Sequence, residues 1–351
     1  MSAVAAGNWG IVGHAEALRQ LQFTAASGQP SHAYLITGPE GVGRTTLALA
    51  FARALNCLAA PEQRPCGVCD SCRRISADAE HRSHSDVTVA DFEWQAAVIG
   101  GPRGDRSRQR QRFSIEAVRW LRQDIVTRPV MARWKIQIID DADQFSEAAP
   151  DAFLKTLEEP PPYAVIILIA GSVDTVSETV RSRCRHVALG LVPRAEIEAA
   201  LMERGETSER AATIARAGRG RVAWALRMAA DPDRWRQRAE HINTAFEQLT
   251  TPLGRLQVTG AVATNFSRRR DQTFELVELY TGLWRDALLY RAGVAEQTAY
   301  PEVGTELAAY AGQFELPTLR RALWASRRCL SDLDANIQAR VALQAMVMQW
   351  P

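Results

Sequence analysis

The chain has 351 residues, of which 46% are hydrophobic and 23% are charged, which is typical of a globular protein with two or three domains. No run reaches the roughly 18 apolar residues that a membrane span needs, and the first ten residues lack the basic start and apolar core of a signal peptide, so we expect a cytoplasmic protein. The net charge of +2 says little about partners. Only Lys135 and Lys155 are lysines among 42 basic residues, a bias that base composition alone can explain.

Up to about residue 192, short apolar runs alternate with helical patterns. This alternation predicts βαβ units around a parallel sheet. The runs at 135–139 and 164–170 are almost continuously apolar, which is typical of strands covered on both faces. We expect strands at AYLIT, DVTVADF, KIQIID, AVIILIAG and HVALGLV.

The first of these strands is followed by GPEGVGRT, residues 38–45, one residue away from the phosphate-binding loop G-x-x-x-x-G-K-[ST]. Its glycines let backbone N–H groups and a helix N-terminus face an anion, and the hydroxyl after position 44 sits where it can reach Mg²⁺. The candidate nucleotide-binding residues here are Gly38, Gly41, Gly43, Arg44, Thr45 and Thr46.

Arg44 stands where the motif has lysine. Guanidinium is bulkier and planar, so phosphate binding can survive the exchange while stabilisation of the transition state suffers. The alternative is neutral replacement of lysine by arginine in a chain that contains only two lysines. Such a replacement is tolerated most easily where ATP hydrolysis is not required. ATP with Mg²⁺ is therefore a cofactor that this chain can still bind, but we do not expect it to hydrolyse ATP.

Four cysteines follow the next helix with the spacing C-x8-C-x2-C-x2-C. In a reducing compartment this spacing favours a metal site over a disulfide framework. Four thiolates suit tetrahedral Zn²⁺ with every position filled, which makes the zinc structural rather than catalytic, and free thiols are the alternative. The predicted ligands are Cys57, Cys66, Cys69 and Cys72, whereas Cys184 and Cys329 are isolated and are interpreted as packing residues.

Residues 100–112, GGPRGDRSRQRQR, contain five arginines, and the pattern predicts an exposed loop. Contact with nucleic-acid phosphates is the functional interpretation, and a solvated insertion is the alternative that we favour.

The segment IQIIDDAD, residues 136–143, is an apolar strand that ends in acidic residues. Ligands bind at the carboxyl ends of strands in such sheets, so Asp140 is a candidate to coordinate Mg²⁺ directly or through water. Asp141 occupies the place of a water-activating glutamate with a side chain one methylene shorter, and a structural or capping role is an equal alternative.

Beyond Pro193 strand patterns vanish and helical ones fill the chain. We predict an α/β nucleotide-binding-type domain over 1–192 with the cysteine module at 57–72, a helical lid over 193–238, and a helical collar domain for oligomerisation over 239–351.

HAYLITGPEGVGRTT, the four-cysteine module, DDAD, FLKTLEEPPP and TVRSRC together resemble the bacterial clamp-loader family of AAA+ proteins, which includes the delta-prime and gamma/tau subunits of DNA polymerase III. The resemblance covers residues 9–192 densely. It implies a P-loop AAA+ module, with delta and gamma/tau subunits, the sliding clamp and primer–template DNA as partners, and no membrane.

In that family the arginine of S-R-C, here Arg183, is the finger that reaches the ATP of a neighbouring subunit. An arginine supplied in trans stabilises charge that develops during phosphoryl transfer. Without the resemblance, Arg183 is one of three arginines at 181, 183 and 185 on a helix end.

Two departures separate this chain from the gamma/tau motor. One is Arg44. The other lies in GRGRVAWAL, where alignment on Gly220 and Leu226 leaves Ala223 at the position of a nucleotide-sensing arginine, while Arg221 lies two residues away on another helix face. The pattern indicates a stator subunit of the delta-prime type. The competing interpretations are an ATP-hydrolysing motor subunit, and an unrelated P-loop nucleotide or nucleoside kinase, which LKTLEEPP does not favour.

Overall fold

The computed structural model describes residues 9–75, 83–100, 112–145, 149–267 and 269–351. The chain divides into two compact units. Among its described residues, the first unit runs to Ile197 and also includes Gly220–Trp224, and the second contains 198–219 and the chain from Ala225 onward. Most of the arginine-rich segment 100–112 falls outside the described residues, so its predicted exposure and both interpretations of its role stay predictions. The domain boundaries proposed at 192 and 238 also stay predictions.

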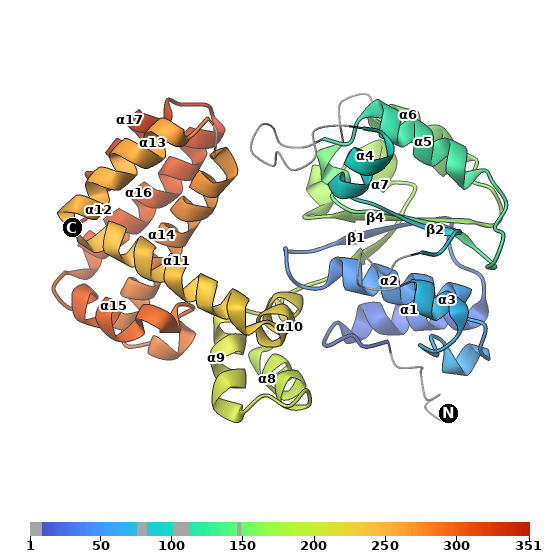
Figure 1. The fold of residues 1–351 in the computed structure, drawn as a ribbon, viewed down its shortest axis with the longest axis horizontal. Coiled ribbons are helices and arrows are strands. Elements are labelled where there is room, and N and C mark those ends of the chain that lie inside the picture. Colours follow the sequence, from blue (N-terminus) through green and yellow to red (C-terminus); the bar gives the residue numbers. More distant parts are fainter. Residues whose placement is uncertain (1–8, 76–82, 101–111, 146–148, 268) are drawn as a thin grey trace. The chain divides into compact units, whose positions relative to one another are not determined.

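The first unit is built on a five-stranded sheet with the order β2-β3-β4-β1-β5, in which every pairing is parallel (Figure 1). All five predicted strands are present. Every residue of β1, β3 and β4 is buried, which explains their nearly continuous apolar sequences. The strands are β1 Ala33–Thr37, β2 Val87–Ala90, β3 Lys135–Ile139, β4 Ala164–Ala170 and β5 Arg185–Ala188.

Helices cover both faces of this sheet, and alternate strand residues pack into two separate cores. On one face, α1 and α2 pack against Tyr34 and Ile36, and on the other α5, α6 and α7 pack against Leu35 and Leu168 (Figure 1). The helices of this unit are α1 Ala15–Ser27, α2 Arg44–Asn56, α3 Asp70–Arg74, α4 Phe92–Val98, α5 Ile115–Ile125, α6 Ala149–Glu158 and α7 Glu178–Arg181. The predicted α/β class is therefore confirmed.

Described residues after β5 contain helices and no strand, as predicted. The helices are α8 Arg194–Met202, α9 Ser208–Gly218, α10 Val222–Ala230, α11 Pro232–Thr250, α12 Pro252–Gln257, α13 Ala263–Asn265, α14 Arg270–Arg291, α15 Gly304–Ala311, α16 Leu316–Asp334 and α17 Ala339–Val347. The larger core of this region surrounds the fully buried Tyr280 and Trp284 of α14. Of the helices that the described residues form, none combines the length and the apolar character needed to cross a bilayer.

Candidate functional site

The glycine-rich loop lies between β1 and α2, at the carboxyl end of the strand, as the motif requires. Gly38, Gly41 and Gly43 all have positive φ, and a Cβ atom added to Gly38 would lie 2.4 Å from the carbonyl oxygen of Leu189. Only glycine fits at position 38 for this steric reason. The loop therefore has the backbone form that presents N–H groups to an anion.

Two segments that are distant from the loop in sequence hold it in place. The Nε2 atom of His14 lies 2.9 Å from the carbonyl oxygen of Val42, and the carbonyl oxygen of Gly41 accepts hydrogen bonds from the backbone N–H groups of Ala223 (2.9 Å) and Trp224 (3.1 Å). His14 has a left-handed φ of 55°. The only local signal of this unusual backbone conformation in the sequence is the glycine that precedes it. The loop is thus braced from both sides by its own unit.

The hydroxyl of Thr45 donates a 2.7 Å hydrogen bond to Oδ2 of Asp140, and the backbone N–H of Asp141 donates to Oδ1 of the same carboxylate at 3.0 Å. The structure therefore brings together two predicted site residues that are 95 positions apart. A hydroxyl and a carboxylate at this separation are oxygen ligands that fit Mg²⁺, which would supply charge neutralisation for bound phosphates. Thr46 is exposed at the start of α2.

Asp141 has a left-handed φ of 57° and a perturbed carboxyl group. Burial, followed by repulsion from Asp140 and Asp143, raises the pKa of Asp141 to about 6, although Arg44 acts in the opposite direction. The side chain makes no capping hydrogen bond to the short helical turn that follows it. A carboxyl group with a raised pKa next to a phosphate-binding loop is typical of functional sites as well as of crowded acidic clusters.

Arg44 lies near the carboxyl end of β4. Its Nη1 atom is 3.8 Å from where a Cβ of Gly171 would be, and Oδ2 of Asp143 accepts a 3.1 Å hydrogen bond from the Gly171 N–H. The guanidinium group therefore extends toward the acidic residues that end β3. The sequence did not single out Asp143 or Gly171, because a carboxylate that binds a backbone amide 28 residues away has no local pattern.

Position 223 faces the glycine-rich loop, but it presents only a methyl group. The Cβ of Ala223 lies 3.8 Å from where a Cβ of Gly43 would be, while the guanidinium of Arg221 lies over the ring of Trp224 at 5.4 Å. The position proposed for a sensing arginine is therefore close to the loop and carries no charge.

The four predicted ligand cysteines form one cluster in which the Sγ atoms lie within 4.8 Å of one another. Tetrahedral zinc thiolates have sulfur atoms roughly 3.8 Å apart, so a small contraction would complete the site. Hydrogen bonds from the backbone amides of Val68 and Cys69 lower the pKa of the Cys66 thiol to about 6, while burial raises the pKa of Cys57. Four convergent sulfurs fit a tetrahedral ion, and zinc itself stays a prediction.

Arg183 lies on the surface immediately after α7. Val180, which is 1% exposed, anchors this short helix in the core, and Cys184 packs against the same core. Burial raises the pKa of the Cys184 thiol to about 12, so the packing interpretation of this cysteine suits its surroundings. The S-R-C segment thus places one side chain inward and the arginine outward, where its side chain is 34% exposed.

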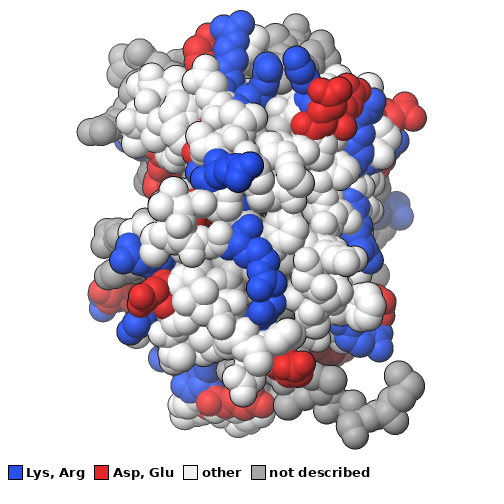
Figure 2. All heavy atoms as spheres, turned by 90° about the vertical axis from the view of Figure 1, so that its right-hand side faces the viewer, with Lys and Arg blue, Asp and Glu red and all other residues white. Residues whose placement is uncertain are grey.

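Basic side chains also gather between α5 and α6. Arg119, Arg122 and Lys155 line a pocket of about 390 Å³ together with Glu159, and none of the three cations forms an ion pair with another described residue. Figure 2 shows one face of the molecule, on which basic side chains are interspersed with uncharged surface. Among the described residues, this pocket is therefore a surface on which positive charge is available to partners.

A glycine-rich loop between β1 and α2, with Thr45 hydrogen-bonded to Asp140 just after β3 of the same parallel sheet, defines a P-loop protein. The sequence model of a family described as DNA polymerase III, delta subunit, matches residues 13–192, just over half of the chain. The protein belongs to this family.

The chain is similar to longer proteins. It is 32% identical over 191 residues to the DNA polymerase III subunit gamma/tau of Mycobacterium tuberculosis, a match that covers 54% of this chain and 30% of that protein. It is 34% identical over 176 residues to subunit tau of Bacillus subtilis, covering 50% of this chain and 28% of that one. The chain thus spans less than a third of the length of these relatives.

A solved structure of a gamma subunit-related protein from Thermotoga maritima matches 84% of this chain and 99% of its own at 18% identity, with a TM-score of 0.44. A similarity of that size carries no functional argument.

Proposed function

We propose that this chain is a delta-prime-type stator subunit of a DNA polymerase III clamp loader, which supplies Arg183 to the ATP site of a neighbouring subunit and hydrolyses little or no ATP itself. The observation that carries the proposal is the pair of side chains at the glycine-rich loop, one within it and one facing it. Position 44 offers a guanidinium and position 223 a methyl, while Arg183 is directed outward. The residues that would act on ATP bound to this chain, at positions 44 and 223, are altered. Arg183, which would act on ATP bound to another subunit, is present.

The proposed chemistry is electrostatic. Charge develops on the transferred phosphoryl group and on the leaving oxygen, and a guanidinium that enters from another subunit stabilises that charge. Arg183 suits this role because its short helix is anchored in the core, so the side chain extends from a fixed base. The similarity to gamma/tau proteins supports gamma/tau and delta subunits as partners, with the sliding clamp and primer–template DNA as what the cytoplasmic complex acts on.

The cysteine cluster fits this proposal as a structural zinc module, held by Cys57, Cys66, Cys69 and Cys72. Zinc would link the segment after α2 to α3 and leave no open coordination position for catalysis.

The second candidate is a gamma/tau-type motor subunit, which the 2.7 Å contact between Thr45 and Asp140 favours. Nucleotide titration of the isolated chain separates the two candidates. We expect no steady ATP turnover, because lysine is absent from position 44 and the sensing position is uncharged. A matched variant, Arg44→Lys with Ala223→Arg, should bind ATP more tightly than the wild type. Micromolar binding with steady turnover by the wild type would favour the motor.

Arg183 itself is tested in the complex reconstituted with gamma/tau and delta partners. Arg183→Ala should abolish clamp loading and lower DNA-stimulated ATP hydrolysis at least about tenfold, because an arginine finger contributes roughly 10³–10⁵ to kcat at the site it serves, while the subunits still assemble. Arg181→Ala is the matched control, because Arg181 is the last residue of α7, two positions before Arg183, and its ion pair with Asp174 is long, at 3.7 Å. An unchanged hydrolysis rate in Arg183→Ala would remove the finger role.

A further inference from the structure

An ion pair joins two motifs that are far apart in sequence. The Nη2 atom of Arg183 lies 2.6 Å from Oε1 of Glu158, the last residue of α6. Glu158 belongs to LKTLEEPP and Arg183 to TVRSRC, so the two motifs whose combination marks the family resemblance are in direct contact. The spacing of 25 residues is the length of chain that leaves α6, forms β4 and returns through α7.

The same guanidinium has a second support on the other side. Its Nη1 atom donates to the backbone carbonyl of Thr179 at 2.7 Å and lies 3.3 Å from the hydroxyl of Ser182. Among the described residues, no acceptor is found for the Nε–H group of Arg183 or for the second N–H of Nη2. A guanidinium has five N–H donors, so it can keep its contacts with Glu158 and Thr179 and still offer two N–H groups to phosphate oxygens.

Both elements that carry the pair are anchored in the same core. Phe153 and Leu157 of α6 are buried, as is Val180 of α7. The backbone that carries Glu158 therefore has a fixed position relative to the base of the Arg183 side chain. A long arginine side chain loses much rotamer freedom when it is ordered, and the ion pair with Glu158 restricts the Arg183 side chain before a neighbour's nucleotide arrives.

The exposure of the pair decides between a stabilising and a positioning role. The side chains of Arg183 and Glu158 are 34% and 50% exposed, and ion pairs this accessible to water contribute little to folding stability. The pair is strong enough to bias the orientation of one side chain and too weak to hold the fold together. Catalytic groups need such support, since a misplacement of about 1 Å can cost two orders of magnitude in rate.

We infer that Glu158 is a positioning residue, which orients the Arg183 guanidinium toward the triphosphate of the neighbouring subunit. The inference rests on the proposed finger role of Arg183. The adjacent Glu159 offers a contrast: it is exposed, as Glu158 is, but it forms no ion pair with another described residue.

The test uses the reconstituted complex with four variants of this chain: Glu158→Gln, Glu158→Asp, Glu159→Gln and Arg183→Ala. Glu158→Gln should lower kcat of DNA-stimulated ATP hydrolysis roughly three- to tenfold and leave KM for ATP within twofold, because the loss lies in the orientation of a group that acts in the transition state. Glu158→Asp keeps the charge and should recover part of the rate, and Glu159→Gln should match the wild type.

A charge-swapped chain, Glu158→Arg with Arg183→Glu, separates positioning from simple stabilisation. It can form an ion pair again but has no finger at position 183, so we expect a rate as low as that of Arg183→Ala. Recovery of the rate in the swapped chain would overturn the inference. Thermal unfolding of each isolated chain checks folding, and the midpoint of Glu158→Gln should match that of Glu159→Gln.

Failure of the finger proposal and failure of this inference give different results. An unchanged rate in Arg183→Ala overturns both. A reduced rate in Arg183→Ala, together with an unchanged or increased rate in Glu158→Gln, leaves the finger role in place and overturns the inference alone.

Discussion

Asp86 and Asp141 lie at opposite ends of the same parallel sheet, and their surroundings shift their pKa values in opposite directions. Asp86 directly precedes β2 and is 1% exposed. Burial raises its pKa, but hydrogen bonds from the backbone amides of Val130, Met131 and Ala132 outweigh burial, and the pKa lies below its ordinary value. Asp141 follows β3 with its pKa raised to about 6. At the amino-terminal end of the sheet, hydrogen-bond donors compensate the carboxylate of Asp86. At the carboxyl end, the carboxylate of Asp141 is repelled by its acidic neighbours.

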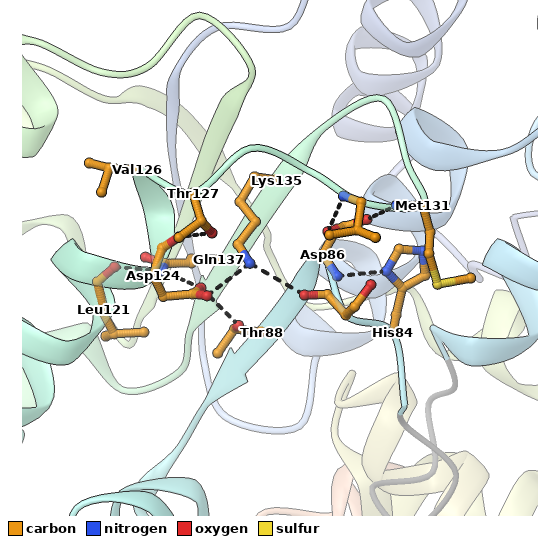
Figure 3. A network of polar contacts seen from close by, with 12 residues as sticks. His84, Asp86, Thr88, Leu121, Asp124, Val126, Thr127, Met131, Lys135 and Gln137 are labelled. Carbon is orange, nitrogen blue, oxygen red and sulfur yellow. Dashed lines mark hydrogen bonds and ion pairs between the residues drawn. The ribbon is translucent and has the colours of Figure 1, made fainter.

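The amino-terminal end is a connected network (Figure 3). The ammonium of Lys135 pairs with Asp124 at 2.8 Å, and Asp124 also accepts hydrogen bonds from Thr88 and Gln137. Next to it, the backbone N–H of Asp86 donates to Nδ1 of His84. These buried groups have their charges compensated within the chain, which suits a structural role.

His84 connects this network to the cysteine module. Because its Nδ1 atom accepts a hydrogen bond, the proton lies on Nε2, which donates to the hydroxyl of Ser71 at 3.0 Å. Ser71 stands between Cys69 and Cys72 in α3. The amino-terminal end of the sheet therefore supports the proposed zinc module, whereas the carboxyl end holds the oxygen ligands that would fit the Mg²⁺ of a nucleotide.

The largest effect should come from Asp86→Asn. Three backbone N–H donors would lose a charged acceptor, and an amide group would face them, so we expect the free energy of unfolding to fall by roughly 3 kcal/mol in denaturant titrations of the isolated chain. Asp174→Asn is the control, because that carboxylate is 86% exposed and should cost less than about 0.5 kcal/mol.

The pH dependence of this loss has a definite sign. Since the pKa of Asp86 is lower in the folded chain than in the unfolded chain, its contribution is present above about pH 4 and is lost as the pH falls through the folded pKa. The gap between wild type and Asp86→Asn should close only in acid. A gap that stays constant down to pH 2 would mean that the charge of Asp86 does not stabilise the fold.

A smaller loss is expected for Lys135→Met. It leaves Asp124 without its cation but with two hydrogen-bond donors, so the cost should be about 2 kcal/mol, below the range for fully buried pairs. The double variant Lys135→Met with Asp124→Asn should lose less than the sum of the two single variants in the same titration. Additive losses would show that the two residues do not depend on each other.

Sequence patterns predicted local motifs of this unit much better than contacts between distant segments. Apolar runs located the strands, and separate motifs located Thr45, Asp140 and the cysteine cluster, because in each case the residues that meet the physical requirement lie within one short stretch of sequence.

Asp86 escaped prediction because its partners are backbone amides 44 to 46 residues away, for which no side-chain pattern exists. The contact between Glu158 and Arg183 escaped for a related reason: both motifs were visible, but only the fold brings them together.

The smallest effect should come from Asp141→Asn, and its sign is opposite. Asparagine has nearly the same shape and tolerates the left-handed backbone at this position, so the change removes little except charge. Because the folded pKa of about 6 lies above the ordinary value, ionisation of Asp141 opposes folding once the pH rises through 6. Since the group is partly accessible to water, the variant should be more stable than wild type by only about 1 kcal/mol at pH 7.5, and equally stable near pH 4.

Denaturant titrations at the two pH values measure the difference. A variant no more stable than wild type at pH 7.5 would mean that the carboxylates at the carboxyl end are as well compensated as Asp86, and the contrast between the two ends of the sheet would not hold.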